Sequence, residues 1–476
     1  MFKQHLNIGN LYKNIGFAVV LNLTIKPINL LLENIVQDKI GHIQYGIFAA
    51  LNALAFLFIV LLDLGINQFL TKDLSSNPEI HADKLSDYFS LKVLLAVIYP
   101  FVMLLVGYLM AYSSSECILL FIISLAYSFY QLSMYLRAKF QASQMFNLDS
   151  LASISDKALL IVFTTILLLI GITVFNYVEA RFLSIFITFL ILAIPAWKIY
   201  TSKSFRLKWN HISWAQILKQ TYPFALITIL FSMHDKIDQV MIERMLGDHA
   251  SGLYAGAYRW LDAFMMFLWI ILPMFFARFS YVRKDPLELR KLLSMSQIIS
   301  GIPMILVSSF VWFYGEQLFF LLGHSTPVEI QEMTLCLKIL FITIMIHAFF
   351  ACFGTLLSST GGEYFINRML ILSILVNIGL NLILLPKMGI SGAALATVIS
   401  NMFISASYIY FILKNKHVQI DYRISGKILL LALLISGLFY ILHKFEMVWW
   451  IAAFIAFAFA AALSFLFQFH RAIKKI

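Results

Sequence analysis

Four titratable residues lie within five positions of one strongly apolar stretch of the chain. This stretch, residues 222–246, has the length and composition of a membrane-spanning helix, and the four are His234, Asp235, Lys236 and Asp238. A charge at the centre of a bilayer costs about 2.5–3.5 kcal/mol on insertion scales, so these side chains are not expected to face lipid. They are expected to line a solvated interior or to pair with one another.

Two of these residues have a spacing suited to carrying an ion. Asp235 and Asp238 lie at i and i+3, on one helical face, where two carboxylates repel each other unless one takes up a proton or a cation. We therefore take Asp235 and Asp238 as candidates for coupling to H⁺ or Na⁺. The alternative is that both only solvate the interior or bind the substrate.

The next apolar stretch repeats the pattern. Tyr254, Tyr258 and Asp262 lie at i, i+4 and i+8 on one helical face, and Arg259 lies beside them. A polar cavity inside a helix bundle explains this placement. The alternative is that the charges pair locally, Arg259 with Asp262 and Lys236 with Asp235.

A polar stripe also follows the first apolar stretch. Asn22, Lys26, Asn29 and Glu33 share one helical face, and Lys26 is too far from either end to reach the membrane surface. Pro27 lies within the stripe and is expected to kink or unwind the helix locally. A helix–helix contact would explain the stripe as well, but we favour a cavity.

Other polar residues are predicted inside the membrane. The second span adds Tyr45, Asn52 and Asp63, although Tyr45 could belong to the aromatic belt at the membrane surface. Three further residues belong to the fourth span and one to the tenth: Tyr127, Gln131, Arg137 and Lys338.

The elements that must position these residues are membrane helices. Of the 476 residues, 61% are hydrophobic and 12% charged, and apolar runs of about 20 residues recur, which excludes both a soluble domain and a barrel. We predict an all-α polytopic membrane protein with about 14 spans. They are residues 14–35, 43–66, 88–112, 116–137, 152–173, 178–200, 221–246, 251–276, 293–316, 330–356, 368–386, 389–413, 425–443 and 447–468.

The net charge of +11 is placed in short loops, where it sets orientation. Lys and Arg are concentrated in alternate loops, while the opposite loops hold little beyond Lys39, Arg181, Lys387 and Lys444. Both termini are therefore expected in the cytoplasm, and the 247–250 turn outside. This distribution does not indicate nucleic-acid binding. The sequence has no phosphate-binding loop, and its three scattered cysteines predict neither a disulfide nor a metal site, so no cofactor is expected.

The chain contains a degenerate internal repeat. Tyr45 and Tyr254 each follow a short polar turn and open a span, so the first two spans correspond to the seventh and eighth. Transporters are commonly built from such halves, with the substrate between them. We predict a six-helix lobe (1–200), a cytoplasmic linker (201–220), a second six-helix lobe (221–414) and two additional helices (415–476).

Three stretches resemble one family of transporters. Residues 62–68, 237–259 and 381–394 are similar to motifs of the polysaccharide transporter family, within the multidrug/oligosaccharidyl-lipid/polysaccharide (MOP) exporter superfamily. In 237–259 the matching positions are Asp238, Gly247, Gly252, Tyr254, Ala257, Tyr258 and Arg259.

This resemblance implies two lobes in a V shape that work by alternating access. It implies a flippase for an undecaprenyl-pyrophosphate-linked oligosaccharide, as in O-antigen and lipopolysaccharide synthesis, in the bacterial inner membrane beside a polysaccharide-assembly machinery. Lys26, Lys236, Arg259 and Lys338 are offset by as many carboxylates, so the chain departs from a strongly cationic cavity. The alternatives are a cation-coupled multidrug-type antiporter and, less favoured, a polytopic sugar polymerase or ligase. We predict a protein that is not an enzyme.

Overall fold

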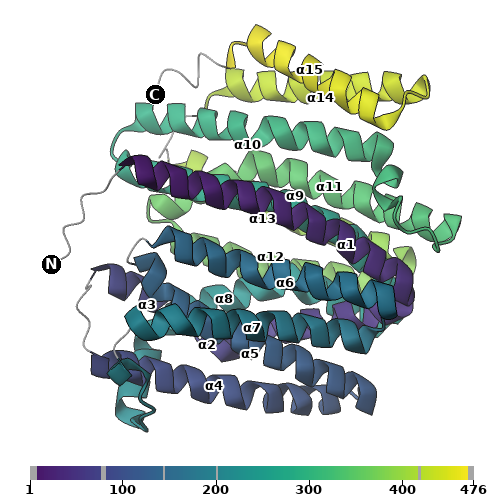
Figure 1. Cartoon of the computed structure of the whole chain (residues 1–476). Coiled ribbons are helices and arrows are strands. Elements are labelled where there is room, and N and C mark those ends of the chain that lie inside the picture. Colours follow the sequence, from purple (N-terminus) through teal and green to yellow (C-terminus); the bar gives the residue numbers. More distant parts are fainter. Residues whose placement is uncertain (1–7, 77–81, 143–144, 200–201, 416–419, 470–476) are drawn as a thin grey trace. The chain divides into compact units, whose positions relative to one another are not determined.

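A computed structural model describes residues 8–76, 82–142, 145–199, 202–415 and 420–469 of the chain. Every regular element within these ranges is a helix (Figure 1). Eleven of the helices described there are long and apolar enough to cross a membrane. The predicted all-helical, multi-pass fold is confirmed.

The chain divides into two compact units, one ending at Glu243 and the other beginning at Arg244. The division falls inside a helix and not in the predicted linker 201–220. The helices of the first unit are α1 (Ile8–Leu57), α2 (Val60–Asp63), α3 (Ile66–Ser76), α4 (Ala82–Leu109), α5 (Ser114–Ala142), α6 (Phe146–Ile170), α7 (Val174–Ile199), the 3₁₀ turn η1 (Ser202–Phe205) and most of α8 (His211–Leu246).

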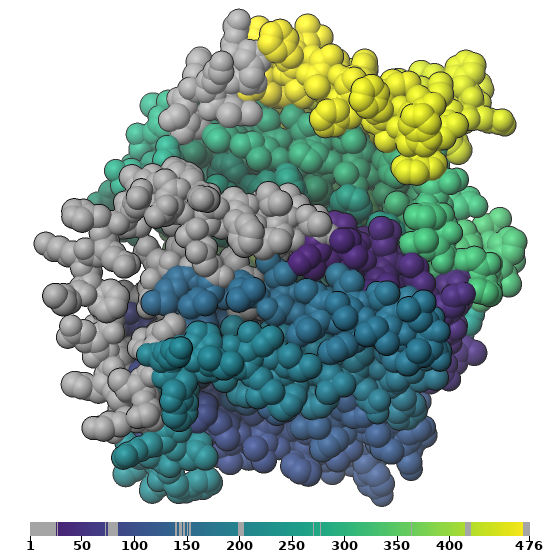
Figure 2. All heavy atoms as spheres, in the orientation of Figure 1, coloured from purple at the N-terminus to yellow at the C-terminus, as the bar shows by residue number. Residues whose placement is uncertain are grey.

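The second unit holds the remaining helices. They are α9 (Asp248–Tyr281), α10 (Pro286–Tyr314), the 3₁₀ turn η2 (Gly315–Phe319), α11 (Pro327–Ser359), α12 (Glu363–Met388), α13 (Ile390–Asn415), α14 (Tyr422–Lys444) and α15 (Trp449–Leu466). The last two form a pair, and α14 packs on α10 (Figures 1 and 2).

The first two predicted spans are the two arms of α1. They meet at Gly41, whose φ of 81° lies in the left-handed region that glycine adopts without a steric penalty. The predicted unwinding at Pro27 is wrong, because the backbone remains helical through that residue and breaks only at Gly41. Gly247, with φ of 88°, makes the matching break between α8 and α9.

The predicted cytoplasmic segments contain more helix than expected. α3 occupies Ile66–Ser76 within the expected loop 67–87, and α8 begins at His211, ten residues before the predicted span. Both extensions are amphipathic and therefore lack the continuous apolar run that marks a span. Moreover, α8 is not among the described helices that are long and apolar enough to cross a membrane, because of its cluster of charges.

The helix neighbours within each unit are consistent with the predicted internal repeat, which stays a prediction. In the first unit α5 packs on α4, α7 and α1, and α6 packs on α7. In the second unit α11 packs on α10, α13 and α9, and α12 packs on α13. The tyrosines of the repeat, Tyr45 and Tyr254, are both buried, so Tyr45 is not part of an exposed aromatic belt.

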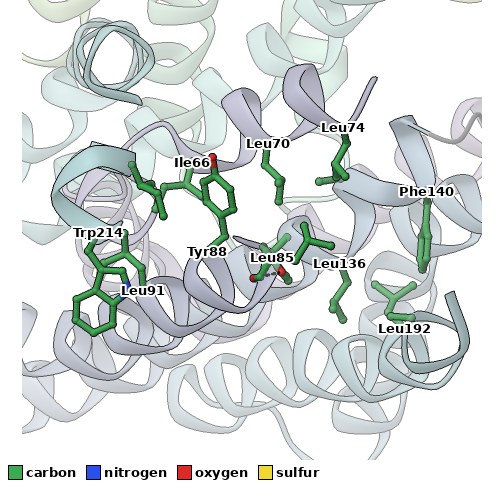
Figure 3. Packing of buried hydrophobic residues seen from close by; sticks show 14 residues of the cluster. Ile66, Leu70, Leu74, Leu85, Tyr88, Leu91, Leu136, Phe140, Leu192 and Trp214 are labelled. Atoms are coloured by element: carbon green, nitrogen blue, oxygen red, sulfur yellow. Dashed lines mark hydrogen bonds between the residues drawn. The ribbon is translucent and has the colours of Figure 1, made fainter. Parts of the chain in front are cut away.

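One hydrophobic core of the first unit joins α3, α4, α5 and the start of α8. Figure 3 shows Trp214 of α8 beside Leu91 of α4, with Leu70 and Leu74 of α3 above the same helix. α2 and α3 are separated by a turn at Leu64 and Gly65, both with positive φ. A Cβ on Gly65 would lie 2.5 Å from the carbonyl oxygen of Thr221, so only glycine lets α8 approach this turn.

Candidate functional site

The first unit encloses a cavity of about 330 Å³ between α1, α5, α6 and α7. Its walls are mixed, with apolar side chains from all four helices and polar or charged ones in between. The polar and charged residues that line it are Asn52, Tyr127, Tyr130, Ser133, Arg137, Asp156, Lys157, Arg181 and Thr188. The sequence also predicts a solvated cavity inside a helix bundle, lined mostly by other residues, and that assignment stays a prediction.

Helical periodicity explains how α5 and α7 supply most of this lining. On α5, Tyr127, Tyr130 and Arg137 lie at i, i+3 and i+10 and therefore share one face. On α7, Arg181 and Thr188 lie seven residues apart on the face that also carries Val178, Ile185 and Leu192. Each helix thus turns one mixed face inward and leaves apolar side chains for the lipid.

Arg181 is the centre of a polar cluster at one side of the cavity. Its Nη1 lies 3.1 Å from Glu33 Oε1 and donates a hydrogen bond of 3.1 Å to the hydroxyl of Tyr177. The guanidinium lies 5.1 Å from the centre of the Phe48 ring. Asn29 Nδ2 donates to the same Glu33 oxygen at 3.4 Å. These contacts fix the arginine while leaving further N–H donors of its five for a ligand.

Arg137 is held by a second cluster. Its Nε donates to Asp149 Oδ1 at 2.7 Å, and Gln141 Nε2 donates to the same oxygen at 3.1 Å. Nearby in the cavity wall, Lys157 Nζ lies 3.6 Å from Asp156 Oδ2. Each of the three cations that line the cavity therefore has a carboxylate partner, and the site is nearly balanced in charge.

Hydroxyl and amide groups lie between these charged clusters. Tyr127 donates a hydrogen bond of 3.2 Å to Asn52 Oδ1. The ring of Tyr127 lies 6.3 Å from that of Phe56, which also lines the cavity. Aromatic faces, hydroxyls and arginines suit a ligand that has both an anionic group and a polar, hydroxyl-rich part.

The predicted site residues of the first unit lie in several places. Asn29 joins the Arg181 cluster through Glu33, whereas the side chain of Lys26 lies outside the described part of the structure. Lys236 Nζ lies 3.1 Å from Asp235 Oδ2, which confirms the alternative of a local ion pair for these two residues. Asp238 is buried in α8.

Asp63 is buried and forms an ion pair with a buried lysine. Its Oδ1 lies 2.7 Å from Lys92 Nζ, and the two side chains are only 8% and 1% exposed. The same oxygen accepts from the backbone N–H of Asn67 at 3.1 Å, and Asn67 Nδ2 donates to Gln131 Oε1 at 2.6 Å. Asp63 is thus a buried partner of Lys92 and is not one of the residues lining the cavity.

The remaining predicted residues belong to the second unit. Tyr254 and Arg259 are buried in α9, and the ring of Tyr258 lies 5.4 Å from that of Tyr254. Asp262 of α9 and Lys338 of α11 are half-buried. The structure therefore brings Tyr254 and Tyr258 together, while the grouping of the second-unit residues with Lys26, Lys236 and Asp238 stays a prediction.

Three charged residues that line the cavity are not among the site residues predicted from the sequence. The charge pattern places Arg181 in an outer loop, yet this residue lies two turns inside α7 and lines the cavity. Asp156 and Lys157 look in the sequence like the polar end of a span. The spacing of Arg181 and Thr188 along one face of α7 is the signal that identifies Arg181.

The class of protein follows from this fold. Lipid II flippase MurJ, in an inward closed conformation, is 15% identical, covers 96% of this chain and 99% of its own, and superposes with a TM-score of 0.78. An inward-facing multidrug resistance MATE family transporter of the MOP superfamily gives a TM-score of 0.69 at 15% identity, over 86% of this chain and 98% of its own. A MOP superfamily transporter from Pyrococcus furiosus gives 0.61 at 14% identity, over 85% and 95%. At such identities the likeness shows the fold, which is that of MOP superfamily transporters.

The family is shown by sequence. The family model described as "Polysaccharide biosynthesis protein" matches residues 11–280, which is more than half of the chain, and this chain belongs to that family. An uncharacterized membrane protein of Methanocaldococcus jannaschii is 26% identical over 203 residues, or 42% of this chain. The match spans about half, 47%, of the length of that relative.

Proposed function

We propose that this chain is a flippase for a lipid-linked oligosaccharide. It moves an undecaprenyl-pyrophosphate-linked repeat unit, such as that of O-antigen, from the cytoplasmic to the outer leaflet of a bacterial inner membrane by alternating access. Membership of a polysaccharide biosynthesis family and the likeness to a lipid II flippase support this choice. We propose transport, not sugar-polymerising chemistry, in concert with the enzymes that assemble the polysaccharide.

The observation that carries the proposal is the cavity of the first unit, whose mostly apolar walls carry charged and polar groups. Three cations and several hydroxyl or amide groups line it, between helices of which α1, α5 and α7 are long and apolar enough to span a membrane. Charged groups buried between apolar helices cost free energy to desolvate even when they are paired, so their presence in this cavity calls for a function. Such a site would keep a polar head group away from the lipid tails while it crosses the membrane.

The chemistry of the lining matches the parts of the proposed substrate. Guanidinium groups bind phosphate oxygens through paired N–H donors, so Arg181 and Arg137 suit a pyrophosphate. Asn52 and Tyr127 suit sugar hydroxyls. A volume of about 330 Å³ lies at the lower end of the range for ligand sites, so it accommodates the pyrophosphate and the nearest sugar, not a whole oligosaccharide. Contacts from Lys26, Lys236 and Arg259 remain part of this proposal.

A cation-coupled antiporter is the second candidate. It is favoured by the carboxylate of Asp156 in the cavity wall and by the likeness to a multidrug resistance transporter. Asp235 and Asp238 are the coupling residues that we propose for either function, with H⁺ or Na⁺ as the ion. Asp235 already pairs with Lys236, so protonation of Asp235 would have to break that contact.

A reconstituted assay distinguishes the two functions. Liposomes containing the full chain and a fluorescent undecaprenyl-pyrophosphate-linked oligosaccharide should show protein-dependent movement of the label between leaflets, detected by an impermeant quencher. A pH-sensitive dye in the lumen reports proton flux in the same vesicles. Uptake of organic cations without any movement of the lipid-linked sugar would contradict the flippase and support the antiporter.

Orientation is a separate expectation from the charge pattern. We propose that both termini lie in the cytoplasm, which places the exposed Leu287 inside and the half-exposed His249 outside. In a background with all three native cysteines replaced by serine, His249→Cys should react with an impermeant maleimide in intact cells. Leu287→Cys should react only after permeabilisation, and the reverse pattern would contradict the topology.

A further inference from the structure

The segment between α7 and α8 is fastened firmly to the first turns of α4. The Ser86 hydroxyl donates to the carbonyl oxygen of Arg206, and the backbone N–H of Lys208 donates to Ser90 Oγ at 2.8 Å. Ser213 Oγ donates to Asp87 Oδ2 at 2.7 Å. Figure 1 shows the segment next to the start of α4. The segment therefore has a defined conformation, which hydrogen bonds to α4 and α8 maintain.

The outer side of this segment is apolar and unusually exposed. Leu207, Trp209 and Ile212 are 67%, 76% and 63% exposed, whereas Trp214, whose ring centre lies 4.8 Å from that of Trp209, is buried in the core. An indole exposed to this extent, in a segment held by so many hydrogen bonds, is expected to have a partner outside the chain.

An adjacent tryptophan indicates the depth of the segment. Trp197 lies in the last turns of α7, where a membrane helix leaves the hydrocarbon, and is 60% exposed. Phe205 stacks on Trp197 with ring centres 5.4 Å apart and planes 3° from parallel. Tryptophans at such helix ends mark the headgroup level, so residues 205–212 lie at that level too.

The charges beside the exposed apolar residues are basic. Arg206 is exposed, Lys208 is half-buried, and Lys219 is exposed two turns into α8. The described carboxylate facing the segment, Asp87, is engaged by Ser213. Cations flanking apolar side chains at headgroup depth complement a lipid that is both apolar and negatively charged.

We propose that residues 205–212 form an interfacial site for an anionic phospholipid. Trp209, Leu207 and Ile212 insert among the upper acyl carbons, and Arg206 and Lys208 contact the phosphate and the negatively charged headgroup. This site is independent of the cavity and of the substrate that the cavity takes. It anchors the connection between α7 and α8 to the membrane surface.

Lipid binding to the purified full chain in neutral detergent tests this site. Fluorescent phosphatidylglycerol and fluorescent phosphatidylcholine are titrated against the wild type, Arg206→Gln/Lys208→Gln and Trp209→Ala. The charge variant should lose on the order of tenfold in affinity for phosphatidylglycerol with little change for phosphatidylcholine. Trp209→Ala should weaken binding of both lipids, because it removes apolar contact.

The matched control is Arg283→Gln/Lys284→Gln, which removes two exposed basic residues between α9 and α10. This variant should bind both lipids like the wild type. Equal loss of phosphatidylglycerol binding in the control and in Arg206→Gln/Lys208→Gln would overturn the site in favour of a diffuse charge effect. Unchanged binding in both Arg206→Gln/Lys208→Gln and Trp209→Ala would overturn it in favour of a protein partner on this surface.

Discussion

Lys92→Met should destabilise the protein by about 3–5 kcal/mol, because it leaves the buried charge of Asp63 without its partner. Lys92 is 1% exposed and lies 2.7 Å from Asp63, and its Nζ also donates to the carbonyl oxygen of Leu62 at 3.1 Å. These contacts hold α4 against the end of α2, next to the turn at Gly65 that α8 covers. The yield of monodisperse protein and its thermal unfolding in detergent measure the loss.

Lys84 provides a matched control. Lys84 Nζ also lies 2.7 Å from a carboxylate, that of Asp73, but its side chain is 46% exposed. Lys84→Met should therefore cost no more than about 1 kcal/mol. The double variant Lys92→Met/Asp63→Asn should recover much of the stability lost in Lys92→Met, since no uncompensated charge remains. Equal losses in Lys92→Met and Lys84→Met would show that burial of the pair is not what matters.

Arg181→Gln should reduce transport of the lipid-linked sugar strongly while leaving folded protein in the membrane. Losing a buried hydrogen bond to a charged group costs roughly 1.5–3 kcal/mol, which corresponds to about a ten- to hundredfold loss of affinity for the head group. Arg181→Lys should recover only part of the activity, because an ammonium lacks the planar fork that binds phosphate. The liposome assay gives the rate, and membrane fractions give the protein level.

A double variant separates transport from structure. Arg181→Gln also leaves Glu33 without its ion pair, so instability could mimic a loss of function. Arg181→Gln/Glu33→Gln removes both charges and should be as stable as the wild type, yet still inactive. Recovery of transport in this double variant would assign Arg181 a purely structural role. Arg290→Gln, which removes a partly exposed ion pair with Asp421 in the second unit, should transport normally.

The helices themselves are predictable because their signal is local. Apolar runs of about 20 residues identify membrane helices wherever they lie. Each predicted span corresponds to an observed helix, with the two arms of α1 taking the first two. α3 and the first ten residues of α8 escape prediction because amphipathic helices outside the hydrocarbon show no such run. The repeat is also visible, since Tyr45 and Tyr254 follow equivalent breaks at Gly41 and Gly247.

The amino-acid sequence is enough to predict the class of fold, the approximate number of spans, and the presence of charges that lipid would not tolerate. These properties depend on residue type and helical spacing. Which charged residues pair with each other, by contrast, depends on how the helices pack. Arg181 pairs with Glu33, 148 residues away in the sequence, and Lys92 pairs with Asp63, 29 residues away. Such partners depend on the angles at which neighbouring helices pack, and no local sequence pattern encodes these angles. The pair of Asp235 with Lys236 could be anticipated because a long, flexible lysine side chain can reach the carboxylate of a neighbouring residue.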